Sequence, residues 1–369
     1  MRLGLFMMPV HPPHRPMYET LAEDVEKSLL ADRLGFDEMF LGEHYSASTE
    51  PYPSPLMFMA SLIPRTENLA FGTGVLSLPN RHPAIIAGEA AQFDHMSRGR
   101  FILGIGTGSL LSDFELLGNG DAALRNRMLI ESIDMIEKIW SHDPPYDLTG
   151  EFWTTRIAQT VNMKLGLGVM PKPYQRPHPP ICVTAASPNS QTVRIAGQRG
   201  WGPISSSFLT AQGLATHWDM LRKGAAESGQ KPSGANWRVV RCIHVAASDA
   251  EARDRVMNER SSYQYYFGYM SEILRGLGRL IALKPRPDMS DDAVTVEGII
   301  DSRVIFGSPQ TVLDKLVALR DQAGPFGSLL MTGVDWGGPN EAWERESMHR
   351  LAESVMPRLS QHAAAQAAE

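Results

Sequence analysis

Two adjacent ionisable residues end a short apolar run near the start of the chain. The stretch FLGEHYSAS, residues 40–48, places the carboxylate of Glu43 beside the imidazole of His44. An imidazole changes charge near neutral pH, so a histidine can accept a proton and return it during a reaction. A surface ion pair or a hydrogen-bonded core histidine would give the same two residues in the sequence. The pair indicates acid–base chemistry only if the fold brings it to a binding site.

Glycine-rich strand ends and a serine-rich turn offer space and donors for a ligand. GTG at 72–74 and GIGTG at 104–108 place glycine inside predicted strands, which indicates a bulge, barrel curvature or close approach of a ligand. AASPNSQT at 185–192 opens a predicted helix with hydroxyl and amide side chains, which suits a phosphate but also ordinary helix capping. A phosphate there would need a cation. Arg125 and Arg127 are the candidates, unless both face solvent.

The elements that would position these residues alternate between strand and helix patterns. Strand–helix alternation requires parallel pairing through helical crossovers, so the sequence predicts an α/β fold, a (β/α)8 TIM barrel, with a doubly wound sheet as the alternative. No G-x-G-x-x-G turn follows the first predicted strand, which argues against the dinucleotide-binding form of that alternative. The predicted strands span 2–9, 36–44, 69–79, 100–108, 181–187, 201–208, 237–248 and 328–336. The predicted helices span 19–35, 54–65, 83–97, 122–142, 189–199, 210–228 and 308–324, with another starting at Asp249.

Two segments interrupt this alternation. Residues 143–180 and 261–300 are predicted insertions after the fourth and seventh strands of a single domain covering 1–369, with a flexible tail over about 361–369. Barrel enzymes carry their active sites at the C-terminal ends of the strands. Glu43 lies at such an end and His44 follows it, so we expect this stretch at the functional rim.

Composition and charge exclude several classes of protein. The net charge of −6 gives no basic field, so we expect no nucleic-acid partner. No apolar stretch has the length of a membrane span, and the first predicted strand begins at Arg2, so we expect a cytoplasmic protein without a signal peptide. His11 and His14 have metal-like spacing but no cysteine partner, so we expect no metal site. The chain also lacks the G-x-S-x-G elbow of acyl-transfer enzymes.

Together these residues resemble the bacterial luciferase-like, flavin-dependent monooxygenase family. The likeness covers essentially the whole chain and is strongest to the limonene monooxygenase-like members. The segments that carry it are RLGLFMMP, GFDEMFLGEHYS, FGTGVLSLPNRHP, FDHMSRGRFILGIGTG, PHPPICVTAASPNSQT and FGSPQTVLDKL.

The resemblance implies a TIM barrel that binds reduced FMN (FMNH2) at its C-terminal mouth. A separate NAD(P)H:flavin reductase would supply the flavin, and O2 would add to it as a C4a-peroxyflavin that oxygenates a small apolar terpene, ketone or aldehyde. His44 matches the catalytic histidine, and Glu43 matches an acidic neighbour that we expect to orient the site. Adjacent strand residues point to opposite faces, so a bend must reconcile the two, or only His44 reaches the flavin. Family resemblance also implies a homodimer formed through the helices near 54–65 and 83–97.

The resemblance also assigns residues to the cofactor. Gly74 and Val75 match a non-proline cis peptide under the flavin, whereas Gly106 and Thr107 stand where luciferase has a cysteine and an arginine. The phosphate would be held by Ala186, Ser187, Ser190 and an arginine, namely Arg127 by its spacing to Glu131, with Arg125 as the rival.

Two other functions remain open at this point. The first is an F420-dependent dehydrogenase on the same scaffold, although F420 enzymes commonly carry Asp-His where this chain has Glu43 and His44, which favours FMN. The second is a non-catalytic flavin-binding homologue. Residues 261–300 fall where this family has a mobile lid, and Met7, Met8, Leu78 and Phe208 are expected to line an apolar pocket with the aromatics of that lid.

Overall fold

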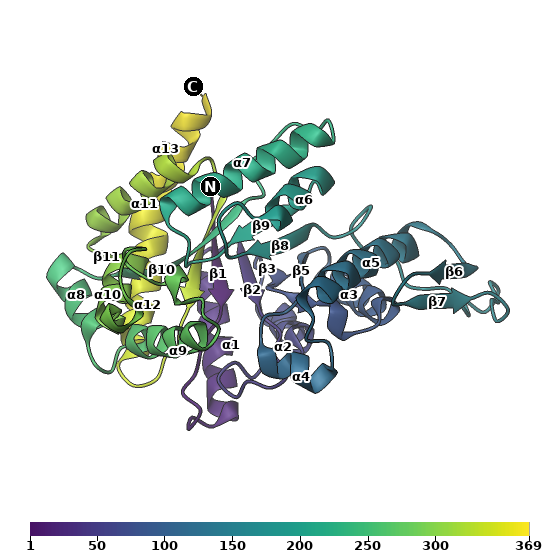
Figure 1. Cartoon of the computed structure of the whole chain (residues 1–369), viewed down its shortest axis with the longest axis horizontal. Coiled ribbons are helices and arrows are strands. Elements are labelled where there is room, and N and C mark those ends of the chain that lie inside the picture. The colour runs from purple at the N-terminus through teal and green to yellow at the C-terminus, as the bar shows by residue number, and fades with distance from the viewer. Residues whose placement is uncertain (369) are drawn as a thin grey trace. The chain divides into compact units, whose positions relative to one another are not determined.

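The computed structural model describes residues 1–368 and contains a closed ring of parallel strands (Figure 1). The order around the ring is β1, β2, β3, β5, β8, β9, β10 and β12, and β12 pairs in turn with β1. The prediction of a (β/α)8 TIM barrel is confirmed. These strands are β1 (Arg2–Met7), β2 (Glu38–Leu41), β3 (Ala70–Thr73), β5 (Phe101–Gly106), β8 (Ile181–Ala185), β9 (Gly202–Ser205), β10 (Arg238–Val245) and β12 (Ser328–Gly333).

The main helices begin and end close to the predicted positions. Proline occupies the first turn of α2, α3 and α11, where its missing N–H needs no partner. Asp121 caps α5 by accepting from the backbone N–H groups of Ala123 and Leu124. These helices are α1 (Met17–Arg33), α2 (Pro55–Leu62), α3 (Pro83–Ser97), α5 (Ala122–Ser141), α6 (Gln191–Arg199), α7 (Ala211–Glu227), α8 (Asp249–Met257) and α11 (Pro309–Ala323). A further helix, α12 (Asn340–Arg350), follows β12.

The predicted insertions contain structure of their own. Residues 143–180 include the antiparallel hairpin of β6 (Tyr146–Thr149) and β7 (Thr154–Ile157). Residues 261–300 include α9 (Ser262–Gly276) and the start of α10 (Val296–Arg303). The terminal helix α13 (Met356–Ala368) continues through most of the segment expected as a tail.

A short strand and a short helix were not predicted. The strand β11 (Val304–Gly307) pairs with the second half of β10, from Cys242 to Val245, whereas β12 pairs with the first half. The helix is α4 (Leu111–Leu117). The strand predicted over 69–79 is divided into β3 and β4 (Leu76–Ser77), and β4 pairs with the end of β5.

The chain divides into two compact units, which are described separately below. Unit 1 comprises Met1–Phe40, Ser48–Glu50 and Val183–Glu369, and unit 2 comprises Leu41–Ala47 and Pro51–Cys182. The single domain over 1–369 stays a prediction. None of the described helices is long and apolar enough to cross a membrane.

Close backbone packing explains one of the strand glycines in unit 2. A Cβ atom on Gly104 would lie 1.8 Å from the carbonyl oxygen of Thr73, so only glycine fits there. The Thr73 hydroxyl donates to the Gly104 carbonyl at 2.7 Å and accepts from its N–H at 2.9 Å. The glycine therefore allows β3 and β5 to approach each other closely.

Candidate active site

Glu43 follows β2 and points into unit 2, where it supports a loop. Its Oε2 accepts from the backbone N–H of Ser77 at 3.0 Å, and its Oε1 lies 3.2 Å from Nη2 of Arg81. The residue is 5% exposed. Burial raises the pKa of Glu43, although the bonds from Ser77 and Arg81 act in the opposite direction. Its neighbours are structural groups, which agrees with an orienting role.

His44 points to a different set of neighbours. Its Nδ1 lies 3.8 Å from Oδ2 of Asp113, and its side chain is 20% exposed. On the other side of the ring, a Cβ atom on Gly42 would lie 3.7 Å from Nε2 of His44 and 3.5 Å from the carbonyl oxygen of Gly74. The imidazole is therefore partly accessible and lies beside a surface formed by glycine backbone.

Asp113 holds the segment that carries His44. The backbone N–H groups of Tyr45 and Ser46 donate to its carboxylate, at 3.2 Å and 2.9 Å, and the Ser46 hydroxyl donates to it as well. Asp113 lies in the first turn of α4 and is 4% exposed. A carboxylate with this many donors has one preferred orientation, so Asp113 fixes the loop that carries His44 and keeps a negative charge near Nδ1 of that residue.

The predicted cis peptide bond between Gly74 and Val75 is present. The N–H of Gly74 donates to the carbonyl of Leu41 at 2.7 Å, which joins this peptide to the end of β2. A Cβ atom on Gly106 would lie 2.6 Å from Cγ2 of Val75, so a side chain at position 106 would displace Val75. Glu43, His44, Gly74, Val75 and Gly106 thus lie in one unit, next to Thr107.

The residues after Gly106 connect this cluster to Arg125. Gly108 has a φ of +80°, and a Cβ atom on it would lie 3.2 Å from the Phe114 ring. The Arg125 guanidinium stacks on the Phe114 ring, with Cζ 3.3 Å from its centroid, and donates to the carbonyls of Asn119 and Gly120 at 3.2 Å and 3.1 Å. Arg125 is 7% exposed, so its guanidinium serves mainly to stabilise the start of α5.

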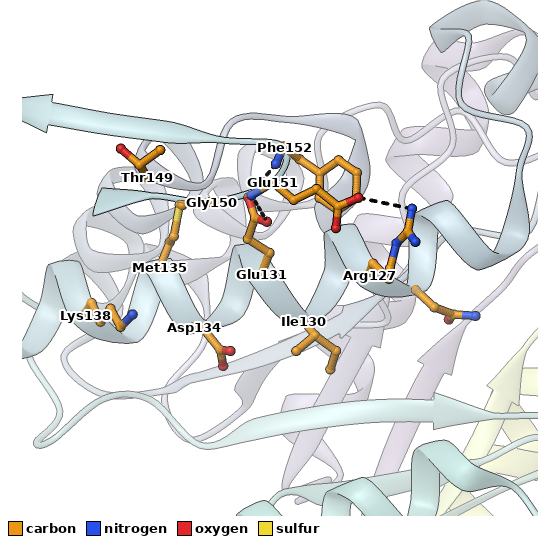
Figure 2. A pocket seen from close by; sticks show the side chains of 11 residues that line it. Arg127, Ile130, Glu131, Asp134, Met135, Lys138, Thr149, Gly150, Glu151 and Phe152 are labelled. Atoms are coloured by element: carbon orange, nitrogen blue, oxygen red, sulfur yellow. Dashed lines mark hydrogen bonds and ion pairs between the residues drawn. The ribbon is translucent and has the colours of Figure 1, made fainter. Parts of the chain in front are cut away.

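Arg127 lies on the surface of α5, with its Cζ 5.6 Å from the centroid of the Phe152 ring. Its side chain is 61% exposed, and its Nη2 lies 3.2 Å from Oε1 of Glu151. Figure 2 shows both residues in a groove of about 540 Å³ between α5 and the turn that joins β6 to β7. The Glu131 carboxylate accepts from the backbone N–H groups of Glu151, Phe152 and Trp153 and so holds that turn against α5. Exposed ion pairs are weak, which leaves Arg127 more available to a ligand than Arg125.

The remaining predicted cofactor residues lie in unit 1. Ala186 and Ser187 are exposed, and Ser190 is half-buried and precedes α6. In the described chain the Ser190 side chain makes no capping hydrogen bond, unlike Thr210 before α7. Hydroxyl groups and the first N–H groups of α6 are therefore available here to an anion. The cofactor roles of these residues stay predictions.

Asp113 was not among the predicted site residues. It stands in SLLSDFELL, where an aspartate near a helix start reads as an ordinary charged residue. Its relation to His44 arises only because α4 folds back onto the segment after β2. The only sequence signal available was its position, shortly after the glycine-rich end of a predicted strand.

Comparison with known proteins agrees with this geometry. The profile of the luciferase-like monooxygenase family matches residues 1–325. Limonene 1,2-monooxygenase of Rhodococcus erythropolis is 31% identical over 97% of this chain and 86% of its own length. 4-Hydroxyprotoasukamycin monooxygenase of Streptomyces nodosus subsp. asukaensis is 31% identical, over 97% and 92%. The oxygenating constituent of 3,6-diketocamphane monooxygenase from Pseudomonas putida, a type II Baeyer–Villiger monooxygenase solved with FMN, superposes with a TM-score of 0.87 at 28% identity, covering 97% of this chain and 98% of that one. The fold, the cis peptide and these matches agree, and the chain belongs to the luciferase-like monooxygenase family.

Proposed function

We propose that this chain is an FMN-dependent monooxygenase, the oxygenase component of a two-component system. It takes up reduced FMN from a separate NAD(P)H:flavin reductase and transfers one oxygen atom of O2 to a small apolar substrate. Relatives named as an oxygenase component and as an oxygenating constituent support the two-component arrangement. A terpene, a ketone or an aldehyde is the substrate class that we favour, because limonene and diketocamphane are named in the relatives.

One observation carries the proposal: a partly exposed imidazole lies beside glycine backbone, close to a non-proline cis peptide bond. His44 is 20% exposed and borders Gly42 and the cis peptide of Gly74 and Val75. A flat ring can approach backbone closely where glycine replaces a side chain. At Gly106 the place of a Cβ atom is filled by the Val75 side chain, so this glycine lets Val75 pack closely against the end of β5. These residues fit an isoalloxazine ring. In unit 1, the polar loop before α6 offers donors of the kind that bind a phosphate.

The residues divide into three roles in this proposal. When it is bound, reduced FMN supplies the chemistry that activates O2. His44 accepts and returns a proton at Nε2, while the carboxylate of Asp113 lies 3.8 Å from its Nδ1. Glu43 acts indirectly, by fixing the Ser77 backbone and Arg81 behind the cis peptide. Gly74, Val75, Gly106 and Thr107 contact the flavin ring, and Ala186, Ser187, Ser190 and Arg127 bind its phosphate.

Some of the residues expected to line an apolar substrate pocket are placed where they could do so. Met8, Phe208, Tyr265 and Tyr269 are partly buried and pack against the same cluster of unit 1, two of them on α9. Met7 and Leu78, in contrast, are 1% and 0% exposed, so both belong to the core instead. The hydroxyls of Thr49 and Tyr269 are 3.1 Å apart and hold α9 in place. Movement of residues 261–300 as a lid stays a prediction.

Two further expectations accompany the proposal. A homodimer formed through α2 and α3 is supported by Met57 and Ile85, large apolar residues of these helices that are 75% and 56% exposed. Sedimentation of the purified chain tests it, because a monomer would contradict this arrangement. We also expect the protein to act in the cytoplasm, where a flavin reductase can supply reduced FMN.

The experiment supplies ¹⁸O2 to the chain with reduced FMN and a panel of terpenes, ketones and aldehydes. We expect one ¹⁸O atom to be incorporated into a product. In the same assay the rate of product formation by the His44→Ala variant should be lower by about 100-fold or more, which is the range of general acid–base catalysis. FMN affinity should change little in that variant. His95→Ala is the matched control, because His95 lies in the same unit and binds the Lys172 carbonyl instead.

Two results would contradict the proposal. Binding of reduced F420 in place of reduced FMN would favour a dehydrogenase, as in relatives of that name that match about 60% of this chain. Binding of flavin with no oxygen incorporation for any substrate, in enzyme that folds normally, would favour a non-catalytic homologue. A His44→Ala variant with the wild-type rate would contradict only the role given to that residue.

A further inference from the structure

Two consecutive residues of α7 hold the loop that precedes α6. The hydroxyl oxygen of Thr216 accepts from the backbone N–H of Asn189 at 2.8 Å. Nε2 of His217 lies 2.8 Å from the carbonyl oxygen of Ser187. The loop is thus held at two backbone positions, although the side chains of residues 186–189 are exposed.

The contacts of His217 determine which of its nitrogen atoms carries the proton. The indole Nε1–H of Trp237 donates to the Ser205 hydroxyl at 2.8 Å, and that hydroxyl lies 2.8 Å from Nδ1 of His217. An indole can only donate and a carbonyl can only accept. The Ser205 hydroxyl therefore donates to Nδ1, and Nε2–H of His217 donates to the Ser187 carbonyl. Burial lowers the pKa of His217, which is 0% exposed, so the ring is neutral and each of its nitrogen atoms has a partner.

The helix that supplies these contacts is itself rigidly joined to α6. A Cβ atom on Gly197 would lie 2.3 Å from the Leu221 carbonyl, and one on Gly224 would lie 1.9 Å from the Arg194 carbonyl. The two helices are therefore in backbone contact, and Figure 1 shows them side by side. The loop continues directly into α6 and is hydrogen-bonded to α7. It is therefore attached at both places to one close-packed pair of helices.

The conformation of the loop needs this support. Asn189 has a φ of +54°, in the left-handed region that asparagine tolerates better than most residues but that is still uncommon. Exposed loops sample several conformations unless contacts restrict them. A loop that is already fixed loses less conformational entropy when an anion binds, so its affinity for that anion is higher.

We propose that Thr216 and His217 are positioning residues, which hold residues 186–190 in the conformation that receives the phosphate of FMN. Neither touches the cofactor: His217 acts through the Ser187 carbonyl and Thr216 through the Asn189 N–H. The inference rests on the proposed function, because it takes the flavin phosphate as the ligand of this loop. It adds two residues to that function that neither the sequence motifs nor the ring site indicates.

The test compares reduced FMN with reduced riboflavin, which lacks the phosphate. Anaerobic equilibrium dialysis of the whole protein, with flavin measured after reoxidation, gives both affinities. His217→Asn keeps an acceptor near Ser205 but loses the donor to Ser187, and Thr216→Val loses the acceptor for Asn189 without a change of shape. Each variant should lower the affinity for FMN about tenfold and leave that for riboflavin unchanged. A merely structural role would affect both flavins alike.

Two further variants sharpen the result. His217→Gln places an amide donor near the former Nε2 position, so it should restore most of the preference for FMN. Thr311→Val is the matched control, because this hydroxyl also joins an early helical turn to a neighbouring group, the Asp249 carboxylate at 2.9 Å. It should leave both affinities unchanged.

Three outcomes of the dialysis experiment would contradict the inference or the function on which it rests. Equal losses for both flavins in His217→Asn and Thr216→Val, or no loss at all, would overturn the inference while leaving FMN as the cofactor. Equal affinities of the wild-type protein for FMN and riboflavin would overturn it too, because the loop would then bind no phosphate. A wild-type protein that binds neither flavin would instead contradict the proposed function.

Discussion

The stability of this protein should fall at alkaline pH because of one buried histidine in unit 1. Nδ1 of His11 lies 2.6 Å from Oδ1 of Asp335, and its Nε2 lies 2.9 Å from Oδ2 of Asp24. Although burial lowers the pKa of His11, hydrogen bonds to the two carboxylates outweigh it and raise the pKa from 6.5 to about 9. Only a protonated imidazole donates from both nitrogen atoms, so the folded state favours the charged ring.

The sign and size of the effect follow from this raised pKa. A pKa that is higher in the folded state stabilises the fold fully below pH 6.5, and this stabilisation is lost as the pH rises through about 9. A tenfold change in a proton-binding constant corresponds to about 1.4 kcal/mol, so the loss approaches about 3 kcal/mol. Asp24 also has a second partner, because Nζ of Lys27 lies 2.9 Å from its Oδ1. A comparison with a variant that lacks the imidazole isolates the part of the change that belongs to His11.

The assay is urea unfolding of the wild-type protein and the His11→Gln variant between pH 6.5 and about 9. We expect the free energy of unfolding of the wild type to fall by about 3 kcal/mol across this range and that of the variant to change far less. His349→Gln is the control, since this histidine is half exposed and pairs with Glu353 on the surface. An identical pH dependence in wild type and His11→Gln would refute the assignment of the protonated ring to His11.

Three other substitutions test the site and the barrel. Asp113→Asn removes the charge beside Nδ1 of His44 and should slow product formation about tenfold with normal FMN affinity; an unchanged turnover rate would argue against this contact. Gly104→Ala places a Cβ atom 1.8 Å from the Thr73 carbonyl and should lower the free energy of unfolding, measured in urea, by about 2 kcal/mol or more. Gly120 has open space around it, so Gly120→Ala should not lower this free energy. Equal stabilities of the two variants would refute the packing argument. Arg127→Ala should weaken binding of reduced FMN but not of riboflavin in dialysis, and an equal effect on both would leave the phosphate to another cation.

Much of the fold was predictable from sequence, because buried parallel strands and amphipathic helices have distinct patterns. The predicted strand ending at Gly108 and the helix over 83–97 agree closely with β5 and α3. The strand β11 was missed because its four residues follow α10 without a break. Such a short run takes its conformation from pairing with β10, a contact that its own sequence does not encode.

The site was predictable only where residues form a local motif. Glu43, His44 and the cis peptide at Gly74 follow from short stretches that resemble the family. Asp113 and His217 do not, because each acts on backbone atoms far away in the sequence, and only the tertiary fold brings them there. The burial of Arg125 could not be predicted either, because its stacking on Phe114 depends on how α4 packs. The choice of Arg127 for the phosphate stays a prediction.

A crystal structure of the protein with bound FMN tests the central claim most directly. We predict the isoalloxazine ring against the Gly74–Val75 peptide, with the imidazole of His44 at its edge and Asp113 still behind Nδ1. A flavin bound elsewhere on the chain, or a His44 ring turned away from it, would contradict the account.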